Sequence, residues 1–280
     1  MRYCFSGHES FYCKSLWLKK GYDYLLNEKS FSDIDAVAEL GVGKNMVSSI
    51  RFWLKSFGLT ISDVPTQIAN YLFNNECGKD AFTEDINTLW LLHYHLVSAN
   101  IASIYSLLFL EFQREKKEFD RDNLHSFIKR KCSVPEQKNV YNENSVRKDI
   151  QVLLRNYVSP TDLKSIEDFS ALLLPLGLIK VRGNDTYYFN ETSDVDIDKA
   201  IILYAILDKK CDDKTISFDA ILELSLLFCI PITKFISIIK LLETDYNGKI
   251  VYTDNSGIKN IHIIENIDKF EVLDKYYSTL

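Results

Sequence analysis

The segment from Ser32 to Phe57 restricts the possible folds of this chain more than any other part of the sequence. Apolar residues recur at helical spacing on both sides of the glycine-containing turn at 41–43. Ser32, with an aspartate three residues later, is a weak capping-box signal for a helix start, and Gly58 is typical of the position just past a helix end. With a further amphipathic helix predicted at 17–26, the pattern favours a helix-turn-helix. A generic three-helix bundle with a solvated outer face is the alternative.

The second helix of this pair, KNMVSSIRFWLKSF, divides into an apolar and a polar face. The polar positions follow one another at spacings of four, three and four residues, and none of them is acidic. The last helix of a helix-turn-helix enters the major groove of DNA, where arginine suits a guanine edge and lysine suits a phosphate. Backbone N–H groups at a helix start also favour a phosphate. We therefore expect a DNA-binding face formed by Lys44, Asn45, Ser48, Arg51 and Lys55.

The charge of the chain limits where such a face can lie. The formal net charge is −6, whereas a protein that binds nucleic acid usually presents a basic footprint. From Asp185 to the end there are 17 acidic and 10 basic residues, which leaves 22 acidic and 23 basic residues in the first 184. We therefore expect a DNA-binding surface in the first two thirds. One modest cationic helix is expected to need a homodimer or a partner to hold DNA tightly.

The rest of the chain predicts further helices and two hairpins. Four helical patterns fill the region from about 85 to 158, and strand patterns with turn signals follow near 178–191 and 249–264. Three helical patterns and the second hairpin give the order of a winged helix at 196–264, whose acidic surroundings favour protein contact or dimerisation. We expect a mainly α fold with small β-hairpins, made of an N-terminal helix-turn-helix domain (1–80), a middle helical bundle (81–160) and a C-terminal winged-helix-like module (161–280).

A second candidate site lies at the start of the chain, in FSGHESFYCK. A buried pair of His8 and Glu9 has the groups for acid–base chemistry, or for binding a metal together with His93 and His95. Two histidines at i and i+2 on a helix point to different faces, so we favour the alternative that this segment fixes the path of the chain by hydrogen bonds. The candidate residues of this second site are Ser6, His8, Glu9 and Lys14.

Other patterns that suggest chemistry have plainer explanations. GVGKN lacks the full phosphate-loop pattern, and no strand precedes it. The basic run at 114–131 is typical of a solvated helix face, although phosphate contact stays open. The six cysteines are scattered without a CxxC pair. We expect no metal, no cofactor and no enzymatic activity.

The location of the protein follows from two further patterns. The first ten residues lack the apolar core of a signal peptide, and no apolar run approaches the roughly 18 to 20 residues needed to cross a bilayer. We expect a cytoplasmic protein without a membrane contact.

Three motifs carry a resemblance to a known family: FSGHESF at the start, GVGKNMV at the turn and TLWLLH in a middle helix. Over about the first 160 residues, and loosely to the end, the chain resembles the domain of unknown function 4007 group of bacteria and archaea. Lys14 departs from the arginine expected there but keeps the positive charge. The resemblance implies an association with sulfur-transfer genes and with DNA phosphorothioation or phage defence, and it supplies no catalytic residue.

Two functions are compatible with these observations. The first is a DNA-binding accessory or regulatory protein in a DNA-modification or phage-defence system, with duplex DNA as its ligand. The second is a non-catalytic scaffold subunit that binds protein partners in a sulfur-transfer or defence complex. The cationic stripe favours the first, and the net charge of −6 favours the second.

Overall fold

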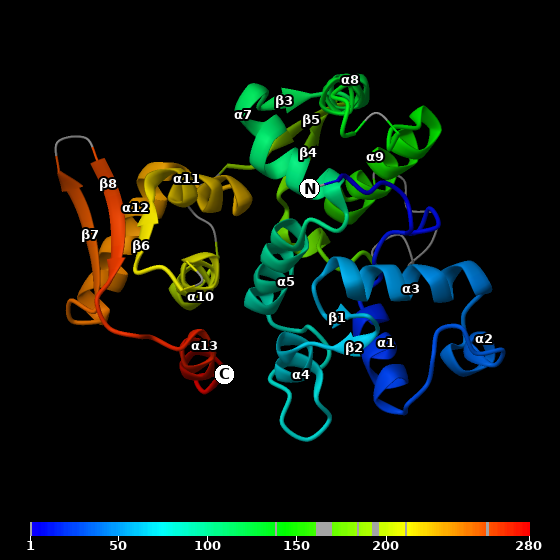
Figure 1. Cartoon of the computed structure of the whole chain (residues 1–280), viewed down its shortest axis with the longest axis horizontal. Helices are drawn as coiled ribbons and strands as arrows, with labels where there is room; N and C mark the ends of the chain where they lie inside the picture. Colours follow the sequence, from blue (N-terminus) through cyan, green and yellow to red (C-terminus); the bar gives the residue numbers. More distant parts are fainter. Residues whose placement is uncertain are drawn as a thin grey trace. The chain divides into compact units, whose positions relative to one another are not determined.

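The computed structural model describes residues 2–137, 139–160, 170–183, 185–191, 196–210, 212–255 and 258–280 (Figure 1). Contacts divide the chain into two compact units, Met1–Asn190 and Glu191–Leu280. The fold is mainly helical with small antiparallel sheets, as predicted. Cys211 and the predicted turn residues Asn184 and Ser256–Gly257 lie outside the described residues.

The first unit begins with three helices, α1 (Trp17–Leu26), α2 (Ala36–Leu40) and α3 (Lys44–Ser56). They follow one another as the sequence predicted, and Gly41 ends α2 in the left-handed conformation at φ 61°. The predicted helix start at Ser32 is wrong. Ser32 donates its backbone N–H to the Ser30 hydroxyl, so the segment forms turns before the short α2 begins.

A hairpin that the sequence pattern did not predict follows α3 directly. Strands β1 (Thr60–Ile61) and β2 (Val64–Pro65) pair in antiparallel register. The two turn residues between them both have positive φ, 51° and 63°, which is the geometry of the tight hairpin turn whose twist matches the strands. In Figure 1, β1 lies beside α3 and β2 beside α1. Helix α4 (Gln67–Phe73) comes next.

The middle helices form the core of the first unit. They are α5 (Ile86–Ala99), α6 (Ser103–Ser106), the π-helix Leu107–Phe112, α7 (Gln113–Glu115), α8 (Arg121–Lys131) and α9 (Glu143–Tyr157). Asp85 and Asn142 accept backbone N–H bonds at the starts of α5 and α9, which explains where these helices begin. The aromatic side chains of α5 and the π-helix are buried, as expected of a core.

The first of the two predicted hairpins belongs to this unit. After the short 3-10 helix Leu174–Leu176, β4 (Ile179–Arg182) pairs with β5 (Thr186–Phe189), and β5 pairs with β3 (Glu118–Phe119). This pairing joins the hairpin to the middle region, and the second compact unit begins at Glu191. The finer division at residues 80 and 160 stays a prediction.

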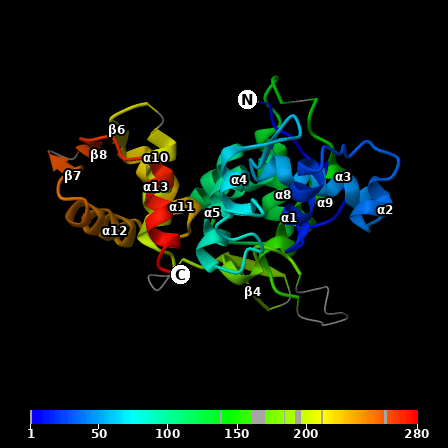
Figure 2. The same ribbon diagram turned by 90° about the horizontal axis from the view of Figure 1, so that it is seen from below.

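The second unit has helices α10 (Lys199–Lys210), α11 (Phe218–Leu227), α12 (Ile232–Asp245) and α13 (Lys269–Tyr277). Strands β6 (Thr215–Ser217), β7 (Ile250–Asn255) and β8 (Ile258–Ile263) form a sheet in the order β6-β8-β7. The predicted order of helices and hairpin is present, with β6 as an added strand. Helices α10 and α13 lie side by side (Figures 1 and 2).

None of the helices among the described residues is by itself long and apolar enough to span a membrane. Two bent pairs reach that length and composition only when their members are combined, namely Ile86–Ala99 with Ser103–Glu115 and Phe218–Leu227 with Ile232–Asp245.

Candidate functional site

The predicted polar face of α3 is present and open. All five residues expected on it are exposed, while Trp53 and Leu54 on the opposite face are fully buried in the first unit. Within the described part of the chain, the side chains of four of the five make no hydrogen bond or ion pair. These four are Lys44, Asn45, Ser48 and Lys55.

Arg51 differs from the other four because it is already paired. Its Nε donates to Oδ1 of Asp63 at 2.9 Å, and a terminal guanidinium nitrogen donates to Oδ2 at 2.6 Å. The carboxylate raises the pKa of the Arg51 guanidinium. Asp63 is the second turn residue of the β1–β2 hairpin, so this two-bond contact ties α3 to the hairpin.

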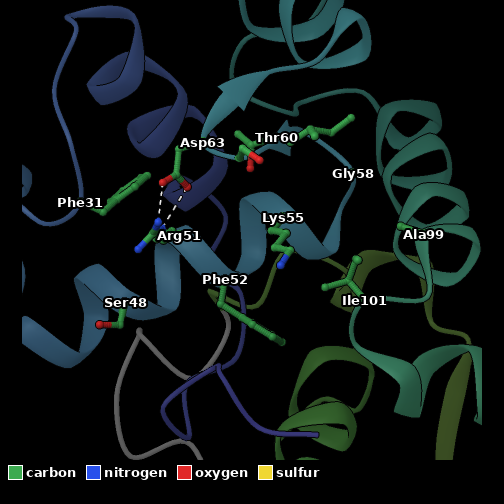
Figure 3. Close-up of a pocket in the computed structure, with 12 residues that line it drawn as sticks. Phe31, Ser48, Arg51, Phe52, Lys55, Gly58, Thr60, Asp63, Ala99 and Ile101 are labelled. Atoms are coloured by element: carbon green, nitrogen blue, oxygen red, sulfur yellow. Dashed lines mark hydrogen bonds and ion pairs between the residues drawn. The ribbon is translucent and has the colours of Figure 1, made fainter. Parts of the chain in front are cut away.

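A groove of about 690 Å³ runs along this face of α3. Figure 3 shows Arg51 and Asp63 next to Phe31, with Lys55 between this pair and Ile101. Its lining combines cationic, polar and apolar side chains from α3, the hairpin and the chain that follows α5. The residues are Phe31, Ser48, Arg51, Phe52, Lys55, Gly58, Thr60, Ile61, Ser62, Asp63, Ala99 and Ile101.

The second candidate site is a loop with unusual backbone conformations. Ser6, Gly7, Glu9 and Ser10 have positive φ of 68°, 105°, 48° and 67°. Such angles are uncommon outside glycine and persist only where the surrounding structure enforces them. The enforcing contacts come from His8, whose side chain is buried.

The partner of His8 is Asp149 on α9, and not Glu9. His8 Nε2 lies 2.8 Å from Asp149 Oδ1, while Glu9 is exposed, so His8 and Glu9 do not form the buried pair that acid–base chemistry would need. The backbone N–H of Ser10 donates to His8 Nδ1 at 3.1 Å. Nδ1 is therefore the acceptor, and Nε2 carries the proton that is donated to Asp149. The backbone N–H of Ser6 completes the arrangement by donating to the Asp149 carboxylate at 3.0 Å.

This loop packs directly against α3. The His8 ring stacks on Trp53 with centroids 6.3 Å apart. A Cβ atom on Gly7 would lie 2.5 Å from the Phe52 ring, so only glycine permits the approach. Both His8 nitrogens are engaged in holding the loop, which supports the positioning role of the segment that we favoured over acid–base chemistry.

Lys14 and His93 have other partners than His8. Lys14 forms an isolated bridge with Ala171, and its ammonium group lies 6.0 Å from the Trp17 ring centroid. His93 Nδ1 lies 2.8 Å from the Tyr157 hydroxyl. No cluster of three or more His, Cys, Asp or Glu side chains suited to a metal occurs among the residues that the structure describes.

The thiol of Cys4 interacts electrostatically with Lys55 of α3. Burial and Asp149 raise the pKa of the Cys4 thiol, although Lys55 lowers it. A raised pKa keeps the sulfur protonated at neutral pH, so Cys4 does not have the character of an activated nucleophile.

Known proteins with a similar sequence or fold give the family of the chain. Residues 5–277 match the family described as "Protein of unknown function (DUF4007)". The magnesium ion-bound SspB crystal structure is 26% identical in sequence with a TM-score of 0.85, and a second SspB crystal structure is 25% identical with a TM-score of 0.82. Each match covers 98% of this chain and 88% of the other. None of the curated proteins matches the chain. The predicted family resemblance is confirmed and extends over nearly the whole chain.

Proposed function

This chain belongs to the DUF4007 family, and we propose that it is an accessory or regulatory protein that binds duplex DNA in a phosphorothioation or phage-defence system. One observation carries the proposal. The outer face of α3 presents five exposed polar side chains, four of which have no protein partner in the described structure. Unpaired cations are the groups that bind phosphates and release counterions.

The kind of DNA contact that each residue makes depends on its position along α3. Lys44 and Lys55, one at each end of the helix, contact phosphates on either side of the major groove. The backbone N–H groups at the start of α3 favour a further phosphate. Ser48 and Arg51 lie between the lysines and face the base edges. Arg51 exchanges Asp63 for a DNA group when it does so.

The cellular system in this proposal is inferred from the similarity of the chain to known proteins. The chain is similar to SspB over nearly its full length, and the resemblance of its motifs implies phosphorothioation and sulfur-transfer neighbours. We propose that the protein contributes DNA binding to such a complex, and that the acidic second unit contacts a protein partner or a second copy.

An anisotropy titration of a labelled duplex at low salt tests the proposal. The double variant Arg51→Ala, Lys55→Ala is expected to bind at least about tenfold more weakly, because two cations leave the interface. The control is Lys234→Ala, Lys240→Ala, which removes two exposed cations from α12 in the second unit. Unchanged binding by the α3 variant would falsify the assignment of this face.

The alternative is a scaffold subunit that binds only proteins. The net charge of −6 favours it, because repulsion between an acidic protein and the phosphates opposes DNA binding. Purification from cells together with sulfur-transfer proteins, combined with no anisotropy change on plain or phosphorothioated duplex, would establish the scaffold and exclude the DNA-binding proposal.

Magnesium is bound in one of the two similar SspB structures. We propose that this chain binds DNA without cleaving it. Incubation of supercoiled plasmid with the protein and Mg²⁺ checks this point, since strand nicking that requires both would show that the protein is an enzyme.

A further inference from the structure

We infer that the groove between α3 and the β1–β2 hairpin holds one unpaired nucleotide of the bound DNA. This inference rests on the proposed function and specifies the ligand of the same face. A helix that only reads base edges needs a convex surface that enters the major groove. Here the polar stripe is instead bordered by a concavity of about 690 Å³, which is within the range of roughly 300–1,000 Å³ usual for small-ligand sites.

The apolar part of the groove suits a base. Phe52 is half-buried on α3, and Ala99 at the end of α5 and Ile101 just after it also line the groove (Figure 3). Because every base has a π-face, stacking on an aromatic side chain accepts a base of any sequence. In a paired duplex that face is covered by neighbouring base pairs, so only an unpaired nucleotide can present it.

The polar part of the groove suits the phosphate and the edge of that base. Lys55 lies one helical turn from Phe52, is exposed and has no ion pair within the described chain. Its ammonium group is therefore available to bind a phosphate. Thr60 also lines the groove. Its hydroxyl makes no hydrogen bond to the described residues and is not one of their buried polar atoms without a partner. The hydroxyl therefore keeps access to solvent and is available to bond the edge of a ligand.

The charge of the groove favours a nucleotide over an apolar peptide as its ligand. The groove has two cations, Arg51 and Lys55, and one acid, Asp63, which is already shared with Arg51. The net positive charge lies next to the aromatic ring. An aromatic surface combined with a phosphate-binding cation is the pattern of single-stranded nucleic-acid sites.

The experiment compares two duplexes of the same sequence, one fully paired and one with a single bulged 2-aminopurine. A distant dye reports binding by anisotropy, and 2-aminopurine emission reports the position of the base. The bulged duplex is expected to bind about tenfold more tightly. Its emission is expected to rise on binding, because the base leaves the DNA stack for the groove.

Two variants localise the effect. Phe52→Leu keeps an apolar side chain on α3 but removes the ring, and Ile101→Glu puts a negative charge into the groove without changing α3. Both are expected to abolish the tenfold preference while retaining binding of the paired duplex. Ile264→Glu, at an exposed position of the second unit, is the charge-matched control and is expected to keep the preference.

The outcomes separate the inference from the proposed function. Equal binding of both duplexes by the wild type, with a normal anisotropy change, would overturn the nucleotide site and leave DNA binding in place. A preference that persists in both groove variants would also overturn it. No anisotropy change with either duplex would remove the proposed function itself.

Discussion

The ion pair between Arg51 and Asp63 affects how α3 can bind an anion. A guanidinium that makes two hydrogen bonds to a carboxylate already has the geometry that it would use for guanine or phosphate. The carboxylate therefore competes with DNA for the same nitrogen atoms. Lys44 and Lys55 have no such competitor in the described structure, so they are the cations that can make first contact.

Replacing Asp63 by asparagine is expected to strengthen duplex binding about three- to tenfold. The change removes one negative charge from the face and releases Arg51 from its bidentate partner. Dissociation constants measured by anisotropy at fixed salt check this expectation. Asp219→Asn, at an exposed position of α11, removes the same charge elsewhere and is expected to have little effect. Weaker binding by Asp63→Asn would show that the pair itself is the binding-competent form.

Replacing Asp149 is expected to lower the free energy of unfolding. Asp149→Ala leaves the Nε2–H group of His8 and the backbone N–H of Ser6 without their shared acceptor in a buried site, which costs about 2–3 kcal/mol. Urea unfolding followed by tryptophan fluorescence measures the loss. Glu9→Ala, at the exposed neighbour of His8, is expected to change stability by less than about 0.5 kcal/mol. Equal effects of the two changes would contradict the assignment of Asp149 as the partner.

His125 is expected to make stability depend on pH. Burial and then the Arg147 guanidinium lower the pKa of His125 in the folded protein, against about 6.5 in the unfolded chain. The unfolded state then binds more protons between these two pKa values. Stability is therefore full above about pH 6.5 and declines as the pH falls through the folded pKa. The urea midpoint at pH 7 and pH 5 measures the decline, which is expected to be smaller in His125→Gln.

Elements differ in how far the sequence could predict them. Helix α3 was predictable because five apolar residues at helical spacing are buried on one face, and the burial is what stabilises the helix. The β1–β2 hairpin was missed because its turn has Ser62 and Asp63 at positive φ, where glycine or asparagine is the usual signal. Asp149 was missed because 141 residues separate it from His8 and no local pattern connects them.

The loop at residues 6–10, before α1, is expected to hold α3 in its position. Gly7→Ala places a Cβ atom 2.5 Å from the Phe52 ring at a residue with φ 105°, and strain of this kind costs about 1–3 kcal/mol. The effect is expected both in urea unfolding and in weaker duplex binding. Gly248→Ala in the second unit, at φ 78° with nothing within 4 Å, is the control: it carries the backbone strain without the clash, so it is expected to cost about 1–2 kcal/mol and to leave duplex binding unchanged. A harmless Gly7→Ala would show that α3 does not depend on this loop.

At the scale of the whole molecule, the two compact units divide the charge as well as the fold. The second unit, from Glu191 to the end, contains 16 acidic and 10 basic residues, so we expect phosphate contacts in the first unit. This asymmetry could be predicted from the sequence, because counting charged residues requires no knowledge of which residues are in contact. It could not predict that the hairpin of β4 and β5 pairs with β3, since that pairing joins strands more than 60 residues apart in the first unit.

The salt dependence of binding is expected to report how many cations and how many copies hold the DNA. Each neutralised phosphate adds about −0.9 to the slope of log affinity against log salt. The two cations that contact phosphates, Lys44 and Lys55, give a slope of about −2 for one copy and about −4 for a homodimer. Anisotropy titrations between 50 and 200 mM salt measure it, and Lys44→Ala is expected to reduce it by about 1 per copy. A slope much steeper than about −4 would mean that other cations contact DNA, and the α3 face would then be only part of the interface.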